Sequence, residues 1–292
     1  MSAEGRLVLV ATPIGNLGDL SPRARQVLAE ADLVCCEDTR RTRQLLTHAG
    51  IRARTLLSVH GHNEQARVGD VVTRLRAGDV VVLVSDAGTP AVSDPGARLV
   101  SAAAAAGVEV TVVPGPNAAV AALVVSGMPT DRFCFEGFLP RKGPDRRRRI
   151  EELTTERRTA LVFETAPRLA ATLAELAEAC GPDRTVAVAR ELTKLHEEVW
   201  RGPLGDAARV FGARDVRGEL VIVLHGAPSP AGPTDEELSA ALRPRLDAGE
   251  TLRVAAADVA RELGVSRRRV YELGIDERQA GAGASPAPAG DS

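Results

Sequence analysis

Short apolar runs alternate with helix-like segments through the first part of the chain. Continuous runs rich in β-branched residues occupy residues 7–13, 31–38, 80–86 and 108–115. Between them, apolar positions recur at helical spacing in segments such as 22–31, 63–77, 93–107 and 116–127. Strands buried on both faces form continuous apolar runs, and parallel strands need helical crossovers. The pattern therefore predicts a parallel sheet with helices on both faces over residues 1–128.

The pattern starts again after residue 128. Strand-like runs follow at residues 133–138, 159–165, 184–192 and 218–226, so that residues 129–227 form a second predicted α/β domain. A Pro-rich linker over 227–234 leads into a small helical module, residues 234–276. The tail, residues 277–292, has few large apolar residues and is predicted to be disordered.

The small module has the spacing of a helix-turn-helix. A small residue, a tight turn, a helix cap and apolar anchors follow one another at Ala260, Gly264, Val265, Ser266, Val270 and Leu273. Arg267, Arg268 and Arg269 open the second helix, where such motifs contact nucleic acid. The alternative is a helical hairpin that packs on the body of the protein.

Composition excludes several classes of protein. The chain has 292 residues, 44% of them hydrophobic, and a formal net charge of −2, which is ordinary for a soluble globular protein. Its four cysteines form no C-x-x-C pair and have no accompanying histidine cluster, so we expect free thiols and no metal. We find no signal peptide and no apolar run near the ~20 residues of a membrane span, and we expect a cytoplasmic protein with no membrane partner.

Four unusual turns follow the predicted strands of the first sheet. They are ATPIGNLGD, CEDTRR, SDAGTP and VPGPNAA, and none is a dinucleotide fingerprint or a P-loop. Parallel sheets bind ligands outside the carboxyl ends of their strands, where these turns fall. Carboxylates there suit hydroxyl-rich or cationic ligands and repel phosphate. A nucleoside with a positive centre fits this pattern, and S-adenosylmethionine is one.

The ordered set of motifs is more specific than any one turn. The strings ATPIGNLGDLS, EDTR, LVSDAGTPAVSDPG, VPGPNAAVAAL, DRFCFEGFLPRKG, ARELTK and GELVIV follow one another between about residues 7 and 273. With these motifs the chain resembles the tetrapyrrole methylase superfamily, and most of all its branch that methylates ribosomal RNA. The resemblance implies two α/β domains with the S-adenosylmethionine cleft between them, in a homodimer. It also implies the substrate, the ribose 2′-hydroxyl of a cytidine in the decoding region of 16S rRNA, within the 30S subunit.

The resemblance also assigns residues to the cofactor. By their place in the motifs these are Ile14, Asp86, Ala87, Gly88, Thr89, Asn117, Ala118, Phe163 and Arg190. The chain departs from the family at 163–168, where Phe-Glu-Thr-Ala-Pro-Arg replaces a run of the Tyr-Glu-Ser-Pro-His-Arg type. That departure puts any role for the missing Tyr and His side chains in doubt. Asp94 and Pro95, in the second acidic turn, are expected to begin the next helix.

Several residues are candidates for the chemistry of proton transfer. Glu37, Asp38 and Arg40 follow the second strand, and the alternative is that they cap the next helix. His60 and His62 are the best placed histidines. Lys142 is one of only two lysines in the chain and shares a proton more readily than arginine does.

The basic loop after residue 138 is the predicted contact with the RNA backbone. Its candidates are Arg141, Lys142, Arg146 and Arg147, although a run of charges is often a solvated helix face. Two rival functions stay open. One is methylation of an anionic tetrapyrrole, and the other is a non-enzymatic regulator that senses a ligand and binds nucleic acid.

Overall fold

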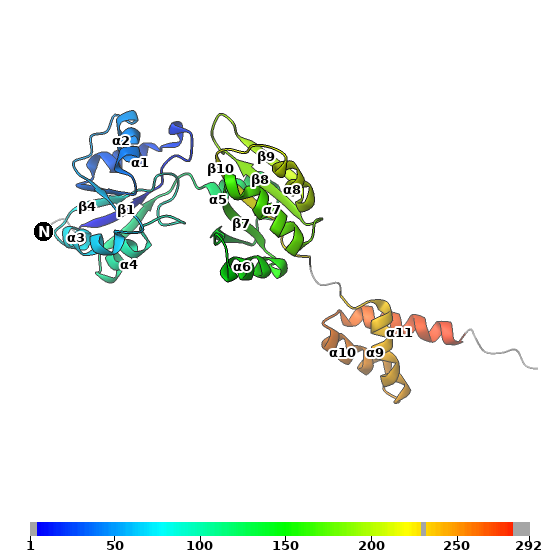
Figure 1. Ribbon diagram of the computed structural model, residues 1–292. Coiled ribbons are helices and arrows are strands. Elements are labelled where there is room, and N and C mark those ends of the chain that lie inside the picture. The colour runs from blue at the N-terminus through cyan, green and yellow to red at the C-terminus, as the bar shows by residue number, and fades with distance from the viewer. Residues whose placement is uncertain (1–4, 229–231, 283–292) are drawn as a thin grey trace, which may run out of the picture. The chain divides into compact units, whose positions relative to one another are not determined.

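The computed structural model describes residues 5–228 and 232–282, and the chain divides into two compact units at residue 228 (Figure 1). The first unit contains both predicted α/β domains. The second contains three helices, α9 (Asp235–Asp247), α10 (Leu252–Leu263) and α11 (Arg267–Ala282). Helix α11 continues past residue 276, so residues 277–282 of the predicted disordered tail are helical, and the remainder of that tail lies outside the described residues. Among the described residues, no helix has the length and apolarity that a membrane span requires.

The first sheet is parallel, as predicted. Its strands lie in the order β3-β2-β4-β1-β5, and their bounds are β1 (Arg6–Val10), β2 (Leu33–Cys36), β3 (Leu56–Ser58), β4 (Val80–Leu83) and β5 (Glu109–Val113). Helices α1 (Pro22–Glu30) and α2 (Thr39–His48) cover one face, while α3 (Glu64–Arg76) and α4 (Ala97–Ala105) cover the other. A short 3-10 helix, η1 (Leu17–Asp19), follows β1. Successive strand residues point to opposite faces, so Cys35 and Cys36 are buried in two different cores as free thiols.

The second sheet is mixed. Its order is β6-β7-β10-β8-β9, with β6 (Phe133–Phe138) parallel to β7 (Thr159–Thr165) and the other pairings antiparallel; the remaining strands are β8 (Thr185–Arg190), β9 (Glu198–Pro203) and β10 (Glu219–Leu224). Strand β9 and helix α8 (Leu204–Gly212) have no counterpart among the predicted elements, because the segment 195–203 alternates too weakly to stand out as a strand.

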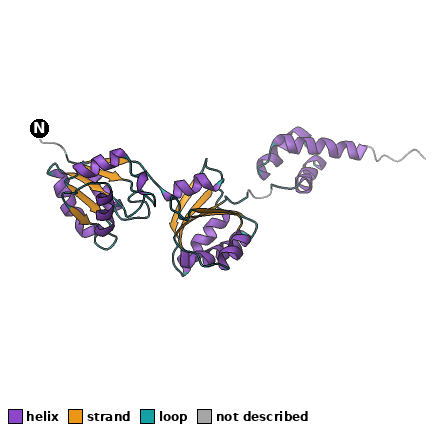
Figure 2. Ribbon diagram, turned by 90° about the horizontal axis from the view of Figure 1, so that it is seen from above, coloured by secondary structure: helices purple, strands orange, loops and turns teal. Residues whose placement is uncertain are grey.

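Both faces of the second sheet are covered by helices (Figure 2). Helices α6 (Pro144–Thr155), α7 (Ala166–Cys180) and α8 pack on one face. The other face packs against α5 (Ala118–Ser126), through Ala119, Ala122 and Leu123. The sequence assigns α5 to the first domain, but its apolar side packs on the second sheet. The loop between β5 and α5 therefore connects the two sheets at the place where the site lies.

Candidate functional site

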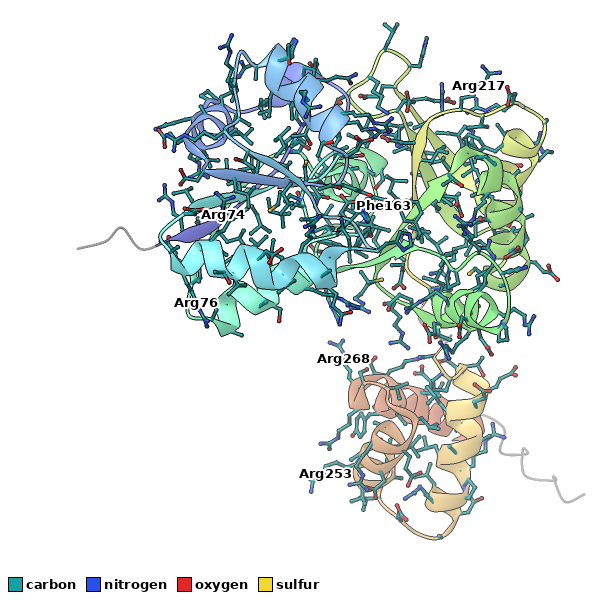
Figure 3. All side chains as sticks on the ribbon, turned by 60° about the vertical axis from the view of Figure 1, so that its left-hand side comes forward. Arg74, Arg76, Phe163, Arg217, Arg253 and Arg268 are labelled. Carbon is teal, nitrogen blue, oxygen red and sulfur yellow. The ribbon has the colours of Figure 1, made fainter. Side chains whose placement is uncertain are left out.

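A pocket of about 750 Å³ is lined by the loops at one edge of each sheet. The first sheet contributes the turns that follow β1, β2, β4 and β5. The second sheet contributes the ends of β6, β7 and β8 and the start of β10, which runs antiparallel to β7. Phe163, at the end of β7, and Arg217, just before β10, are among the lining residues labelled in Figure 3. The predicted ligand edge of the first sheet is thus part of a walled cavity.

Of the nine predicted cofactor residues, eight line this pocket: Ile14, Asp86, Ala87, Gly88, Thr89, Asn117, Ala118 and Phe163. Arg190 does not line it, which corrects its assignment. Its Nε donates to Glu198 Oε2 at 3.1 Å, and its Nη1 donates to the carbonyl of Arg217 at 3.2 Å. Arg190 therefore supports the loop before β10 from behind.

Hydrogen bonds between neighbouring turns hold the SDAGTP loop in place. The N–H of Thr12 donates to the carbonyl of Gly88 at 2.9 Å, and the N–H of Gly88 returns a bond to Thr12 at 3.0 Å. Gly88 has φ +80, and a Cβ there would lie 3.3 Å from Ile14 Cγ2, so this position favours glycine. Thr89 Oγ1 donates to Pro116 at 3.2 Å, and Asn117 Nδ2 donates to Thr89 Oγ1 at 3.3 Å.

Asp86 is positioned by the turn after β2. Its Oδ1 accepts the backbone N–H of Asp38 at 3.1 Å, and its Oδ2 lies 3.5 Å from Arg41 Nη1. The guanidinium of Arg41 is itself 64% exposed by side chain and lines the pocket. The carboxylate of Asp86 is thus held at the pocket wall and keeps lone pairs for a ligand.

Asp94 does not begin helix α4, which corrects the sequence-based expectation. The helix starts at Ala97, and the carboxylate of Glu64 caps it from α3: Glu64 Oε1 accepts the N–H groups of Gly96, Arg98 and Leu99 at 3.1, 2.9 and 3.2 Å. Asp94 instead lines the pocket. The chain reaches it through Ala91 (φ 67) and Ser93 (φ 62), two left-handed residues that are uncommon for side chains other than glycine.

Carboxylates dominate the charge of the pocket wall. Five acidic residues line it, against two arginines, and they are Glu37, Asp86, Asp94, Glu164 and Glu219. Burial, and next the charge of Glu37, raises the pKa of Asp94 to about 6. Burial, and next the charge of Asp86, also raises the pKa of Glu37. Both carboxyl groups therefore hold their protons up to a higher pH than ordinary carboxyl groups do.

Glu164 is a structural carboxylate at the base of this wall. It is 2% exposed and accepts bonds from the N–H of Thr165 and the hydroxyl of Thr172, each at 2.7 Å, while Arg168 Nε lies 3.3 Å away. With these partners a buried charge is stable, and the run 163–168 that departs from the family pattern keeps a firm local structure.

The other predicted catalytic residues lie elsewhere. Asp38 caps α2 and accepts the backbone and side-chain N–H groups of Arg40, and these bonds hold the pKa of Asp38 down at about 2. Asp38, Arg40, His60, His62 and Lys142 are all absent from the pocket lining. The arrangement of Asp38 and Arg40 fits the capping alternative, and Glu37 is left as the predicted catalytic residue that faces the pocket.

The basic loop is divided between surface and core. Arg141, Lys142 and Arg147 are exposed. Arg146 is only 7% exposed, and its guanidinium donates to Glu175 at 2.7 Å, to Thr172 Oγ1 at 2.9 Å and to the carbonyl of Pro140 at 3.0 Å. Through these bonds Arg146 holds the loop to α7. The prediction that Arg146 contacts RNA is therefore corrected, because its side chain is buried.

In the helical unit, the predicted turn is present between α10 and α11. Gly264 ends α10 with φ +64, Ser266 Oγ accepts the N–H of Arg269 at 3.3 Å, and Val270 is fully buried. The three arginines differ, however. Arg269 binds Asp235 at 2.7 Å and Arg268 binds Glu272 at 2.7 Å, so each already has an acidic partner within the unit. Arg267 is exposed, and no hydrogen bond holds its side chain among the described residues.

Several lining residues escaped the sequence analysis. These residues are Arg41, Phe138, Leu192, Arg217 and Glu219. Arg41 lies in the first turn of helix α2, and the other four lie at an end of a strand or in the loop next to one. Glu219 opens β10, and a strand start lies at the ligand edge only when that strand is antiparallel to its neighbours. The apolar run in GELVIV predicts a strand, but it does not indicate that this strand runs antiparallel to its neighbours.

Comparisons with known proteins agree with the fold and with the motifs. The family of Tetrapyrrole (Corrin/Porphyrin) Methylases matches residues 6–208. Two solved structures share the fold: uroporphyrin-III-C-methyltransferase from Thermus thermophilus, 23% identical over 75% of this chain and 94% of that one with a TM-score of 0.54, and the methyltransferase CobJ, 22% identical over 76% and 95% with a TM-score of 0.57.

Curated relatives are much more similar in sequence. A "Ribosomal RNA small subunit methyltransferase I" of Synechocystis is 44% identical over 93% of this chain and 98% of its own length. The protein of the same name from Xylella fastidiosa (strain Temecula1) is 52% identical over 78% and 84%, and that from Pseudomonas aeruginosa is 42% identical over 95% and 99%. The chain therefore belongs to the tetrapyrrole methylase family, in the branch formed by the ribosomal RNA small subunit methyltransferases I.

The position of Asp94 predicts how stability depends on pH. A carboxyl whose pKa is raised in the folded protein costs stability when it ionises, so Asp94→Asn should stabilise the ligand-free protein at pH 7.5, on the order of 1 kcal/mol. The gain should shrink as the pH falls from about 6 towards 4, where wild-type Asp94 is neutral. Denaturant unfolding at several pH values measures this, with the exposed Asp131→Asn as control. A variant that is less stable than wild type at pH 7.5 would contradict it.

Proposed function

We propose that this protein transfers a methyl group from S-adenosylmethionine to the ribose 2′-hydroxyl of a cytidine in the decoding region of 16S rRNA. The observation that carries the proposal is the pocket, where eight of the nine predicted cofactor residues come together. The curated relatives support the choice of substrate, since their shared name describes methylation of small-subunit ribosomal RNA.

The residues present fit the cofactor. Carboxylates at the wall suit a ligand that carries both a sulfonium charge and ribose hydroxyls, because they accept hydrogen bonds and attract a cation. Asp86 is the principal polar partner, and the backbone of Ala87 to Thr89 approaches closely because Gly88 lacks a side chain. Ile14, Leu192 and Phe163 provide apolar surface for a purine ring.

When bound, the cofactor would supply an activated methyl group for transfer to the acceptor oxygen. The protein's contribution is to align the acceptor hydroxyl with that methyl group and to keep water out of the pocket. The hydroxyl proton must leave during the reaction. Glu37 is the predicted catalytic residue on the wall, and burial raises its pKa towards the range of a useful base, so we assign the proton to its carboxylate.

The electrostatics favour RNA over a tetrapyrrole. A tetrapyrrole with several carboxylates would have to enter a pocket whose own wall carries five carboxylates and two guanidiniums. A ribose hydroxyl is neutral, and the phosphates beside it stay outside, where Arg141, Lys142 and Arg147 are exposed. A ligand-sensing regulator would not need a basic loop of this kind, and the methyltransferase relatives count against it.

A homodimer and the 30S particle belong to the same proposal. Exposed valines on β5 and α5 support a contact between two copies: Val112, Val120 and Val124 are 48%, 46% and 67% exposed. The decoding region is assembled within the 30S subunit, and a cytoplasmic site of action follows from that substrate.

The decisive experiment offers three acceptors. The protein is incubated with labelled S-adenosylmethionine and 30S subunits, naked 16S rRNA or uroporphyrinogen, and the labelled nucleotide is mapped by primer extension at low nucleotide concentration. We expect label on a single cytidine ribose of the rRNA. Label on the tetrapyrrole alone would refute the proposal, and cofactor binding without transfer to any acceptor would favour the regulator.

Asp86→Ala should abolish measurable binding of S-adenosylmethionine, because the carboxylate that faces the pocket is lost while its neighbours stay. Calorimetric titration of the cofactor measures this. Asp131→Ala, an exposed carboxylate outside the pocket, is the matched control. Unchanged cofactor affinity in the Asp86 variant would remove this residue from the proposed site.

Lys142→Ala should weaken RNA binding roughly threefold to tenfold and lower the salt dependence of that binding by about one charge, since one phosphate contact is lost. Cofactor affinity should not change, because Lys142 does not line the pocket. Lys142→Arg keeps the charge and should restore RNA affinity. Methylation and RNA affinity equal to wild type in the Ala variant would exclude Lys142 from the RNA contact.

A further inference from the structure

Aromatic side chains are scarce in this chain, and several of them meet at the pocket. The sequence has five Phe, one Trp and one Tyr. Phe135 and Phe163 pack edge to face with centroids 4.9 Å apart, and Phe138 packs in the same way on Phe163 at 5.5 Å. Phe138 lines the pocket and is nevertheless 50% exposed. One edge of the aromatic cluster is therefore open to the cavity.

A bulge in β6 turns Phe138 towards the pocket. The register of β6 against β7 shifts between Phe135 and Gly137, so that Phe135 pairs with Leu161 while Phe138 pairs with Phe163. In a regular strand, residues 135 and 138 would point to opposite faces. The extra residue of the bulge brings both rings to the face that carries Phe163.

Gly137 makes this geometry accessible. It has φ +61, a left-handed conformation, and a Cβ at this position would lie 3.0 Å from Ser93 Oγ. Ser93 belongs to the strained loop of the first sheet that also carries Asp94. The ring of Phe138 is thus presented next to the carboxylate loop rather than on the outer surface of the sheet.

The two residues that follow Phe138 are fixed by hydrogen bonds, and the basic residues come directly after them. Leu139 is buried, and its carbonyl accepts a bond from Arg168 Nη2 at 2.8 Å. Pro140 is held in turn by Arg146. Arg141 and Lys142 follow, both exposed and at most about 14 Å of chain from Phe138. An apolar ring and two cations lie within the span of one or two nucleotides.

We propose that Phe138 is the stacking platform for the unpaired nucleobase of the acceptor nucleotide, an inference that rests on the proposed function. A ribose buried in the pocket requires its base to leave the helical stack, and proteins receive such bases on aromatic rings. Phe163 holds the ring of Phe138 in a fixed orientation, and the exposed half of that ring meets the base. Arg141 and Lys142 then receive the neighbouring phosphates.

The adenine of the cofactor is the competing occupant, since it offers the same flat aromatic surface. The difference in burial between Phe138 and Phe163 favours the RNA base as the partner of Phe138. Phe138 is half-exposed beside the basic loop, whereas Phe163 is more deeply buried and lies with Ile14 and Leu192 in the apolar cluster around α5. Affinity for each partner, measured separately, distinguishes the two.

The test uses Phe138→Leu, which keeps apolar volume and removes the aromatic face, and Phe138→Trp, which restores one. The matched control is Phe133→Leu, at the other end of the same strand, 42% exposed and absent from the pocket lining. Each full-length variant is assayed for the KM of the rRNA substrate that wild type methylates and for the calorimetric Kd of S-adenosylmethionine.

We expect Phe138→Leu to raise the RNA KM by about tenfold or more, as the loss of one base–aromatic stack does, with the cofactor Kd unchanged. Phe138→Trp should recover most of the affinity, and Phe133→Leu should resemble wild type. An unchanged RNA KM in Phe138→Leu, or a cofactor Kd weakened as much as the RNA KM, would overturn the proposal. Failure of wild type to methylate any rRNA would instead overturn the proposed function.

Discussion

The reciprocal pair of backbone hydrogen bonds between Thr12 and Gly88 is the constraint on which the site depends. Parallel strands leave their terminal loops unpaired, and such loops ordinarily move independently. Here the loop after β4 is paired to the end of β1 and, through Thr89, to the turn before α5. These bonds fix the backbone from which Asp86 and Asp94 project, while the N–H of Asp38 and the guanidinium of Arg41 hold the carboxylate of Asp86 at the cavity wall.

The sequence was most informative where a strand is buried on both faces. The continuous runs at 7–13 and 80–86 predicted β1 and β4, and the parallel order followed from the helices between them. Strand β9 was missed, because an edge strand with one solvated face has a weak pattern. The predicted domain boundary at residue 128 groups α5 with the first sheet, whereas α5 packs on the second. The sequence of an apolar helix does not indicate which of two sheets it will cover.

The site shows the same division. Residues inside a motif shared with the family, such as Ala87 to Thr89, were assigned from that resemblance, and they line the pocket. Residues whose role depends on a distant partner were not predictable from local pattern. Arg146 looks like a member of a basic run and is held by Glu175 from another helix, and Arg269 looks like a nucleic-acid contact and binds Asp235. In a chain that uses arginine for almost every positive charge, sequence does not distinguish structural arginines from free ones.

The cap that Glu64 provides for α4 has a wider consequence. A helix usually draws its cap from the loop that precedes it, which ties the composition of that loop to the stability of the helix. Here the cap comes from another helix, so the side chains of Ser93 and Asp94 in the preceding loop are not needed to cap α4. The carboxylate that caps α4 is therefore a different one from the carboxylate of Asp94, which lines the pocket. A change at Asp94 alters the pocket wall and leaves the cap of the helix behind it in place.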